Sequence, residues 1–176
     1  MPPVPPVLSE RLELASMSPG FIMALLRGDR ERAGHEIDAH VPADFVGNHE
    51  NVLRMRLGQM QQDRTCQPWL LRAMITREGP RQVIGRIGFH GPPEEDRRVE
   101  IGYTVFPAHR GQGFATEACR ALFAWAHEEH GITRFRASVS PGNGPSLAVV
   151  RKLGFRRTGV QWDEIDGEEL VFEHDL

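Results

Sequence analysis

Three strand-like segments in the middle of the chain, separated by short connections, constrain the fold more than any other feature of this sequence. They run from Trp69 to Thr76, from Gln82 to His90 and from Val99 to Phe106. Turn residues at 78–81 and a charged loop at 91–98 join them. A parallel crossover needs about a dozen residues or more, so connections this short predict an antiparallel meander.

The N-terminal third predicts one strand and two helices. Leu8 to Ala15 alternates weakly and predicts a first strand, and a serine and a proline at 18–19 predict the start of a helix. From Asp29 to Asp63 the pattern is polar and broken, and only its second half predicts a helix. Residues 1–7 form a leader whose four prolines favour an extended polyproline conformation.

After the meander, helices and strands alternate. Gly111 to Glu129 has apolar residues at a period of about 3.6, which predicts a helix. A strand from Arg134 to Ser140, a helix from Asn143 to Leu153 and a hairpin around Asp166-Gly167 follow. The order predicts a single α/β domain over residues 8–176, built on a mixed sheet of about seven strands flanked by helices.

Composition and charge exclude several classes of protein. A 176-residue domain with 40% hydrophobic residues needs neither a disulfide nor a metal to hold its core. A formal net charge of −3 argues against nucleic-acid coat proteins and basic membrane-surface proteins. No apolar run approaches the roughly 18 residues of a membrane span, and the N-terminus does not resemble a signal peptide. We therefore expect a cytoplasmic protein that binds neither nucleic acid nor membrane.

The densest chemical signal is the stretch from Val105 to Ala118, where a strand leads through a glycine-rich loop into a helix. The first turn of a helix has unpaired N–H groups and a partial positive charge. Gly111 and Gly113 let the backbone approach a phosphate closely, and Arg110 adds a guanidinium suited to phosphate oxygens. The loop lacks the lysine of a P-loop, and Thr116 stands where a dinucleotide fingerprint has its third glycine or alanine.

Two motifs in the second half of the chain resemble those of the GNAT superfamily of acetyl-CoA-dependent N-acetyltransferases. Residues 110–115 read RGQGFA and match the signature Arg/Gln-x-x-Gly-x-Gly/Ala. Residues 143–146 read NGPS, and KLGF follows at 152–155, as in the ribosomal-protein N-terminal acetyltransferases of the RimJ/RimL type. The resemblance is strong from Val83 to Phe155, whereas the segment from Asp29 to Arg64 has no recognised signature.

The resemblance implies a GNAT-like, mostly antiparallel sheet and an enzyme. The enzyme would move an acetyl group from acetyl-CoA to a primary amine by direct attack in a ternary complex. The amine would belong to a protein N-terminus or to a small molecule, and no metal is implied. A non-catalytic acyl-CoA-binding module is the alternative, and a homodimer is left open.

The resemblance also assigns contacts to acetyl-CoA. The backbone of Val105 would pair with the pantetheine arm as an added strand, and Asn143 would hydrogen-bond this arm near the thioester. Backbone N–H groups of the glycine-rich loop would hold the pyrophosphate. The expected cofactor contacts are Val105, Phe106, Arg110, Gly111, Gln112, Gly113, Phe114, Ala115, Thr116 and Asn143.

Ser146 and Glu100 are the expected catalytic side chains. Ser146 would donate a proton to the leaving thiolate, with Tyr103 as the weaker candidate, although a serine here could also only cap its helix. An amine with a pKa of about 10 is mostly protonated at neutral pH, so a base must take its proton. Glu100 lies on the strand expected to bind the cofactor; the alternatives are a solvated strand glutamate at this position and Glu117 as the base.

The eight histidines predict no metal site. His127 and His130 lie near a helix C-terminus, where cations are favoured, and the chain contains no His-Glu-x-x-His motif. His109 flanks the glycine-rich loop and either contacts a phosphate or lies on the surface. Cys66 and Cys119 form no Cys-x-x-Cys pair, so we expect two reduced thiols.

Overall fold

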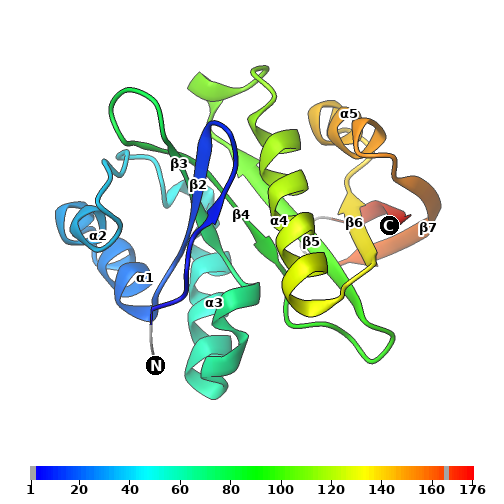
Figure 1. The fold of residues 1–176 in the computed structure, drawn as a ribbon, viewed down its shortest axis with the longest axis horizontal. Coiled ribbons are helices and arrows are strands. Elements are labelled where there is room, and N and C mark those ends of the chain that lie inside the picture. Colours follow the sequence, from blue (N-terminus) through cyan, green and yellow to red (C-terminus); the bar gives the residue numbers. More distant parts are fainter. Residues whose placement is uncertain (1–2, 165–166) are drawn as a thin grey trace.

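A single mixed sheet organises the molecule (Figure 1). The computed structural model describes residues 3–164 and 167–176, which contain eight strands in the order β1-β2-β3-β4-β5-β6-β8-β7. The strands are β1 (Val7–Leu8), β2 (Leu12–Ser16), β3 (Arg72–Thr76), β4 (Val83–Phe89), β5 (Arg98–Val105), β6 (Arg134–Val139), β7 (Arg156–Asp163) and β8 (Gly167–Asp175).

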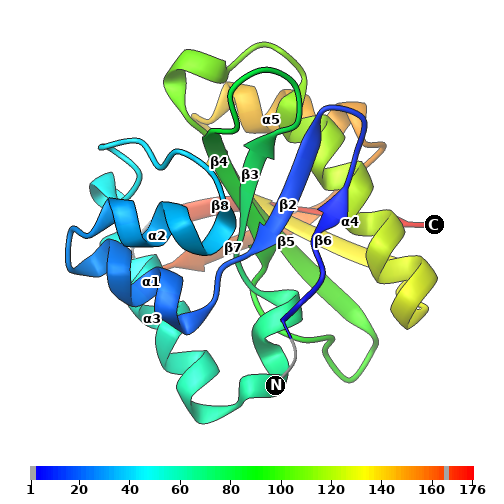
Figure 2. The same cartoon turned by 60° about the vertical axis from the view of Figure 1, so that its left-hand side comes forward.

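Helices cover both faces of this sheet (Figure 2). Paired residues Leu14 and Met74 point into the core beneath α4, whereas the next pair, Ala15 and Ala73, points into a second core beneath α1 and α3. The helices are α1 (Pro19–Leu26), α2 (Arg30–Ile37), α3 (Glu50–Gln62), α4 (Phe114–His130) and α5 (Gly144–Lys152), with short 3-10 turns η1 (Gly47–His49), η2 (Arg64–Trp69) and η3 (Pro107–His109). Among the described helices, none is long and apolar enough to cross a membrane.

The predicted antiparallel meander is confirmed, because β3, β4 and β5 pair antiparallel in sequence order. The sheet has one strand more than expected, since the segment from Leu8 to Ala15 is a hairpin and not one strand. Ser9 makes the turn, its Oγ accepting a hydrogen bond from the Leu12 N–H at 3.1 Å. In this hairpin Val7 takes the buried position and Leu8 is 55% exposed.

Two further predictions on the N-terminal half need correction. Residues 29–63 contain two helices, because α2 precedes the predicted helix α3. Trp69 belongs to η2, and the strand begins only at Arg72. Pro68 has no N–H to donate to a sheet, and the Trp69 ring packs on Trp125 with 5.1 Å between centroids.

The C-terminal predictions are confirmed in the residues that the structure describes. Asn143 caps α5, its Oδ1 accepting a hydrogen bond from the Ser146 N–H at 3.2 Å. Gly131 ends α4 in the left-handed region, with φ of 65°. Strands β7 and β8 form the final hairpin, and Gly167 has φ of 75°, while Asp166 of the predicted turn lies outside the described residues.

The parallel strands β5 and β6 pair over a short stretch and then diverge. These strands pair only from Arg98 to Glu100 on β5 and from Arg134 to Arg136 on β6. The His90 N–H donates to the Glu100 carbonyl at 2.9 Å, so even-numbered residues of β5 turn their backbone polar groups toward β4. Because this direction alternates along a strand, the backbone N–H and C=O groups of Tyr103 and Val105 face β6. They lie beyond the residues at which β5 and β6 pair, so they face a gap.

Candidate active site

A cleft of about 520 Å³ lies where β5 diverges from β6. The end of β5, the loop leading into α4 and the first turns of α5 line it. The cleft brings together eight of the ten residues expected to contact acetyl-CoA, together with Ser146 and Tyr103. Those eight are Val105, Arg110, Gly111, Gly113, Phe114, Ala115, Thr116 and Asn143.

Phe106 and Gln112 do not line this cleft. The Phe106 side chain is 8% exposed and packs edge-on against Phe45, with 5.6 Å between ring centroids. The Gln112 carbonyl accepts a hydrogen bond from Nη1 of Arg11 at 3.1 Å. Phe106 therefore anchors the end of β5 in the core, and the Gln112 carbonyl ties the glycine-rich loop to the turn between β1 and β2.

The glycine-rich loop has the backbone geometry of an anion site. Gly111 and Gly113 have φ of 74° and 83°, a region that residues with a Cβ adopt only at a cost. Gly113 is the N-cap of α4 and offers no side chain to the first-turn N–H groups. Those donors, with the partial positive charge of the helix, are left to a ligand in the cleft.

Basic side chains surround the loop. Arg110, His109 and Lys152 all line the cleft. Arg110 donates from Nε to the Val105 carbonyl at 2.9 Å, which orders the loop against the end of β5. Lys152 was not predicted as a site residue: it lies in the second motif, but only the fold brings the last turn of α5 to the loop.

Ser146 and Tyr103 are neighbours in the cleft. The Tyr103 hydroxyl donates to the Ser146 carbonyl at 3.4 Å, and burial raises the pKa of Tyr103. Asn143 supplies the cap of α5, and the Ser146 hydroxyl has no hydrogen bond within the described residues. The sequence placed Tyr103 on the meander and made it the weaker candidate, whereas the structure places Tyr103 and Ser146 in one cleft.

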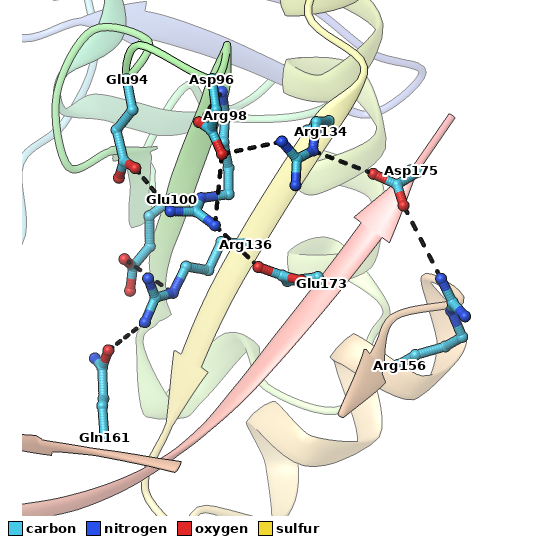
Figure 3. Close-up of polar contacts among 10 residues, drawn as sticks. All are labelled: Glu94, Asp96, Arg98, Glu100, Arg134, Arg136, Arg156, Gln161, Glu173 and Asp175. Atoms are coloured by element: carbon cyan, nitrogen blue, oxygen red, sulfur yellow. Dashed lines mark hydrogen bonds and ion pairs between the residues drawn. The ribbon is translucent and has the colours of Figure 1, made fainter. Parts of the chain in front are cut away.

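Glu100 lies on the sheet face opposite α4 and is 16% exposed, so it is not a solvated strand glutamate. Its carboxylate is 3.7 Å from His90 Nδ1 and 3.7 Å from Arg136 Nε. Figure 3 shows Arg136 reaching from β6 toward both Glu100 and Gln161. The same view shows Arg98 and Arg134 paired with acidic side chains of the loop before β5 and of β8.

Glu117 has a structural partner and is not free to act as a base. Its carboxylate accepts hydrogen bonds from Ser9 Oγ at 2.7 Å, from the Arg11 N–H at 2.8 Å and from Arg11 Nε at 2.7 Å. Burial alone would raise the pKa of Glu117, but the hydrogen bonds from Arg11 and Ser9 and the Arg11 charge outweigh it and lower this pKa. Glu117 thus fastens the first turn of α4 to the β1–β2 hairpin.

We expect Glu117→Gln to lower the free energy of unfolding at pH 7 by about 1–3 kcal/mol, because hydrogen bonds to a partly buried charge are lost. The folded-state pKa lies below the ordinary value of 4.5, so this stabilisation is complete above that value and is lost as the pH falls through the folded pKa. Urea unfolding at pH 7 and pH 3 measures both effects. Glu128→Gln, an exposed change on the same helix, is the control. Equal stability of the two variants at pH 7 would contradict this role of Glu117.

The described residues contain no group of three or more histidine, cysteine or acidic side chains that could hold a metal ion. His130 packs between Trp69 and Trp125, with ring centroids 4.6 and 4.8 Å away. His127 Nδ1 lies 3.1 Å from the Ile132 carbonyl. Both histidines therefore make structural contacts at the C-terminal end of α4.

Comparison with known proteins agrees with this geometry. The family model described as an acetyltransferase (GNAT) domain matches residues 11–156. The chain belongs to the GNAT acetyltransferase family. This confirms the resemblance drawn from the two sequence motifs, and the GNAT match also includes the N-terminal segment in which no signature was recognised.

Individual GNAT relatives give a narrower view. The chain is 36% identical over 86 residues to the uncharacterized N-acetyltransferase YoaA of Bacillus subtilis. The aligned residues make up 49% of this chain and 49% of YoaA. It therefore spans about half the length of the curated relatives it matches.

Solved structures confirm the GNAT fold. The ribosomal-protein-S5-alanine acetyltransferase of Vibrio fischeri superposes with a TM-score of 0.65 at 12% identity, covering 97% of this chain and 96% of that one. The microcin C7 self-immunity acetyltransferase MccE, solved with acetyl-CoA and AMP, superposes with a TM-score of 0.65 at 17% identity, covering 95% and 93%. At these identities the likeness concerns the fold alone.

Proposed function

We propose that this GNAT chain transfers the acetyl group of acetyl-CoA to a primary amine. The observation that carries the proposal is the convergence, in one cleft, of the uncapped N-terminus of α4 with the unpaired edge of β5. The first is a site for phosphate oxygens, and the second accepts an extended chain with amide groups. Acetyl-CoA has both parts, joined by the pantetheine arm.

Different residues of the cleft bind different parts of acetyl-CoA. The N–H groups from Gly111 to Thr116 hold the pyrophosphate, and Arg110 and Lys152 add positive charge. The backbone of Tyr103 and Val105 pairs with the pantetheine arm, although the Val105 carbonyl must first release Arg110. Asn143 lies at the opposite wall of the cleft, where it orients the arm.

Transfer then requires protons to leave the amine nitrogen and a proton to reach the thioester sulfur. Glu100, directly or through water, takes a proton from the ammonium so that the nitrogen lone pair can attack the acetyl carbonyl carbon. As the new C–N bond forms and the C–S bond breaks, the sulfur leaves as a thiolate. Ser146 donates a proton to this thiolate and regains one, through water, from the attacking nitrogen, which thereby becomes a neutral amide N–H. Tyr103 lies close enough to share the donation to sulfur.

Thiol release from acetyl-CoA, measured over a panel of N-terminal peptides and small amines, tests the proposal. Release that depends on an amine supports transfer. Tight binding of acetyl-CoA with no release in the presence of any amine would instead indicate an acyl-CoA-binding module.

We expect Ser146→Ala to lower kcat while the dissociation constant of acetyl-CoA stays nearly unchanged, because a proton donor acts only as the thiolate leaves. The melting temperature should also stay nearly unchanged, since the α5 cap is the Asn143 side chain. Steady-state kinetics and calorimetry measure both. Tyr103→Phe is the comparison: normal turnover in Ser146→Ala with slowed turnover in Tyr103→Phe would move the role to the tyrosine.

A further inference from the structure

Three arginine side chains are buried, and two of them have clear partners. Arg72 donates to the carbonyls of Pro5 and Pro68, each at 3.0 Å, and Arg56 donates to the His90 carbonyl at 2.6 Å. Arg86 is 5% exposed, and within residues 3–164 and 167–176 it forms no hydrogen bond and no ion pair. Its Nη1 is fully enclosed and has no acceptor.

An unpaired buried guanidinium is costly. Removing a charge from water costs several kcal/mol unless a counter-charge or hydrogen bonds replace the water. Burial lowers the pKa of Arg86 to about 10, so the group is still charged at pH 7. The described residues around Arg86 supply no carboxylate, and Nε and Nη2 are not among the enclosed atoms, so a bound molecule can supply the counter-charge.

Arg86 lies beside the reaction site. It is on β4, directly opposite Thr104 of β5, and Thr104 lines the cleft. Arg86 and Glu100 lie on the same face of the sheet. His90 of β4 is opposite Glu100, and Arg86 is four residues before His90, an even number that keeps both side chains on one face. Four residues of strand span about 13 Å, so a small molecule or the end of a peptide can reach both side chains.

The charge in this region favours a carboxylate over a phosphate. His49, at the start of α3, is the neighbouring titratable group, and burial followed by the Arg86 charge lowers its pKa. A neutral His49 leaves one uncompensated positive charge. A carboxylate carries one negative charge and two oxygens in the geometry of the guanidinium fork, whereas a phosphate would bring a second charge without a partner.

We propose that Arg86 binds a carboxylate of the acceptor, so that the acceptor is an amine with a carboxylate several bonds away. This rests on the proposed acetyl transfer. The carboxylate belongs to an amino acid or to an acidic side chain at a peptide N-terminus. Arg86 sets specificity by pairing with this group while Glu100 takes the proton from the amine.

Matched acceptors test this specificity. One pair is 4-aminobutanoate and 4-aminobutanamide, and the other is the tripeptide amides Glu-Ala-Ala and Gln-Ala-Ala. In the wild type we expect kcat/KM to favour the carboxylate member of at least one pair by about tenfold or more, the worth of one charge-assisted hydrogen bond. The pair that responds distinguishes a small acceptor from a peptide.

Arg86→Met should abolish this preference, chiefly by raising KM for the carboxylate acceptor, and should leave the dissociation constant of acetyl-CoA unchanged. Arg86→Lys keeps the charge without the fork and should retain part of the preference. A wild type that does not distinguish the members of either pair, or a preference that survives in Arg86→Met, would overturn the inference.

Stability separates a ligand-binding arginine from a structural one. Arg86→Met removes an unpaired charge and should leave the melting temperature unchanged or higher, whereas Arg72→Met breaks hydrogen bonds to carbonyls and should lower it. An equal fall of the melting temperature in the two variants would overturn the inference, because Arg86 would then have a structural role in the core.

A binding measurement separates the failure of this inference from failure of the proposed transfer. With CoA present, 4-aminobutanoate or Glu-Ala-Ala amide should raise the melting temperature of the wild type and not that of Arg86→Met. If this shift occurs and no amine is acetylated, the carboxylate site stands and acetyl transfer fails. If neither probe shifts the melting temperature and the wild type acetylates neutral amines equally well, transfer stands and the carboxylate site fails.

Discussion

Gly113→Asp is expected to abolish acetyl-CoA binding in calorimetry. The residue caps α4 at φ of 83°, where an aspartate side chain is strained and would add a negative charge at the N-terminus of the helix, beside the phosphate site. Two like charges about 4 Å apart near a protein surface repel by about 4 kcal/mol, which corresponds to a loss of affinity of more than about 100-fold.

Gly113→Ala is the matched control for backbone strain. It introduces a Cβ at the same φ, which costs about 1–2 kcal/mol of stability, without adding charge. No atom lies closer than 3.6 Å to the position of that Cβ, so the alanine variant should fold and bind acetyl-CoA nearly as well as the wild type. Unaltered affinity in Gly113→Asp would place the phosphates elsewhere.

Glu100→Gln is expected to reduce turnover near neutral pH by about 10²–10⁴-fold, the usual effect of removing a general base. Glutamine keeps the shape of the side chain but cannot accept the proton. The rate should recover partly at high pH, where more of the acceptor is free amine. The pH profile of kcat/KM for wild type and variant measures this.

Glu173→Gln provides the control for charge on this sheet face. Glu173 also pairs with an arginine, its Oε1 accepting from Arg98 Nη1 at 3.0 Å. Neither glutamate lines the cleft itself, but Glu100 lies on β5, whose end forms a wall of the cleft, whereas Glu173 lies on β8. Its turnover and pH profile should match those of the wild type. A Glu100→Gln variant with unchanged kcat and raised KM for the acceptor would show that Glu100 binds the ammonium and that another group removes the proton.

The sequence predicted best those features that are encoded locally. Ser18 begins α1 by accepting a hydrogen bond from the Phe21 N–H at 2.9 Å, and Asn143 and Gly131 mark the ends of other helices as predicted. Each signal acts within one helical turn, so the neighbouring residues suffice to identify it. The glycine-rich loop before α4 was predictable for the same reason, since residues 110–116 are one continuous stretch, whereas Lys152 reaches the same cleft only through the fold.

Features that depend on distant packing were missed. Helix α2 has a single buried residue, Ala33, so no apolar period marks it in the sequence. Trp69 looked like part of a strand, but its ring is held by Trp125 from α4. The surroundings of Glu100 and the unpaired Arg86 come from separate strands, which only the register of the sheet brings together.

Amine-dependent release of CoA thiol, with detection of the acetylated amine by mass spectrometry, tests most directly whether this GNAT cleft transfers acetyl groups. We expect equal amounts of free thiol and acetylated amine in the wild type, with strong loss of both in Glu100→Gln and Gly113→Asp. Saturable binding of acetyl-CoA without acetylation of any peptide or small amine would contradict acetyl transfer.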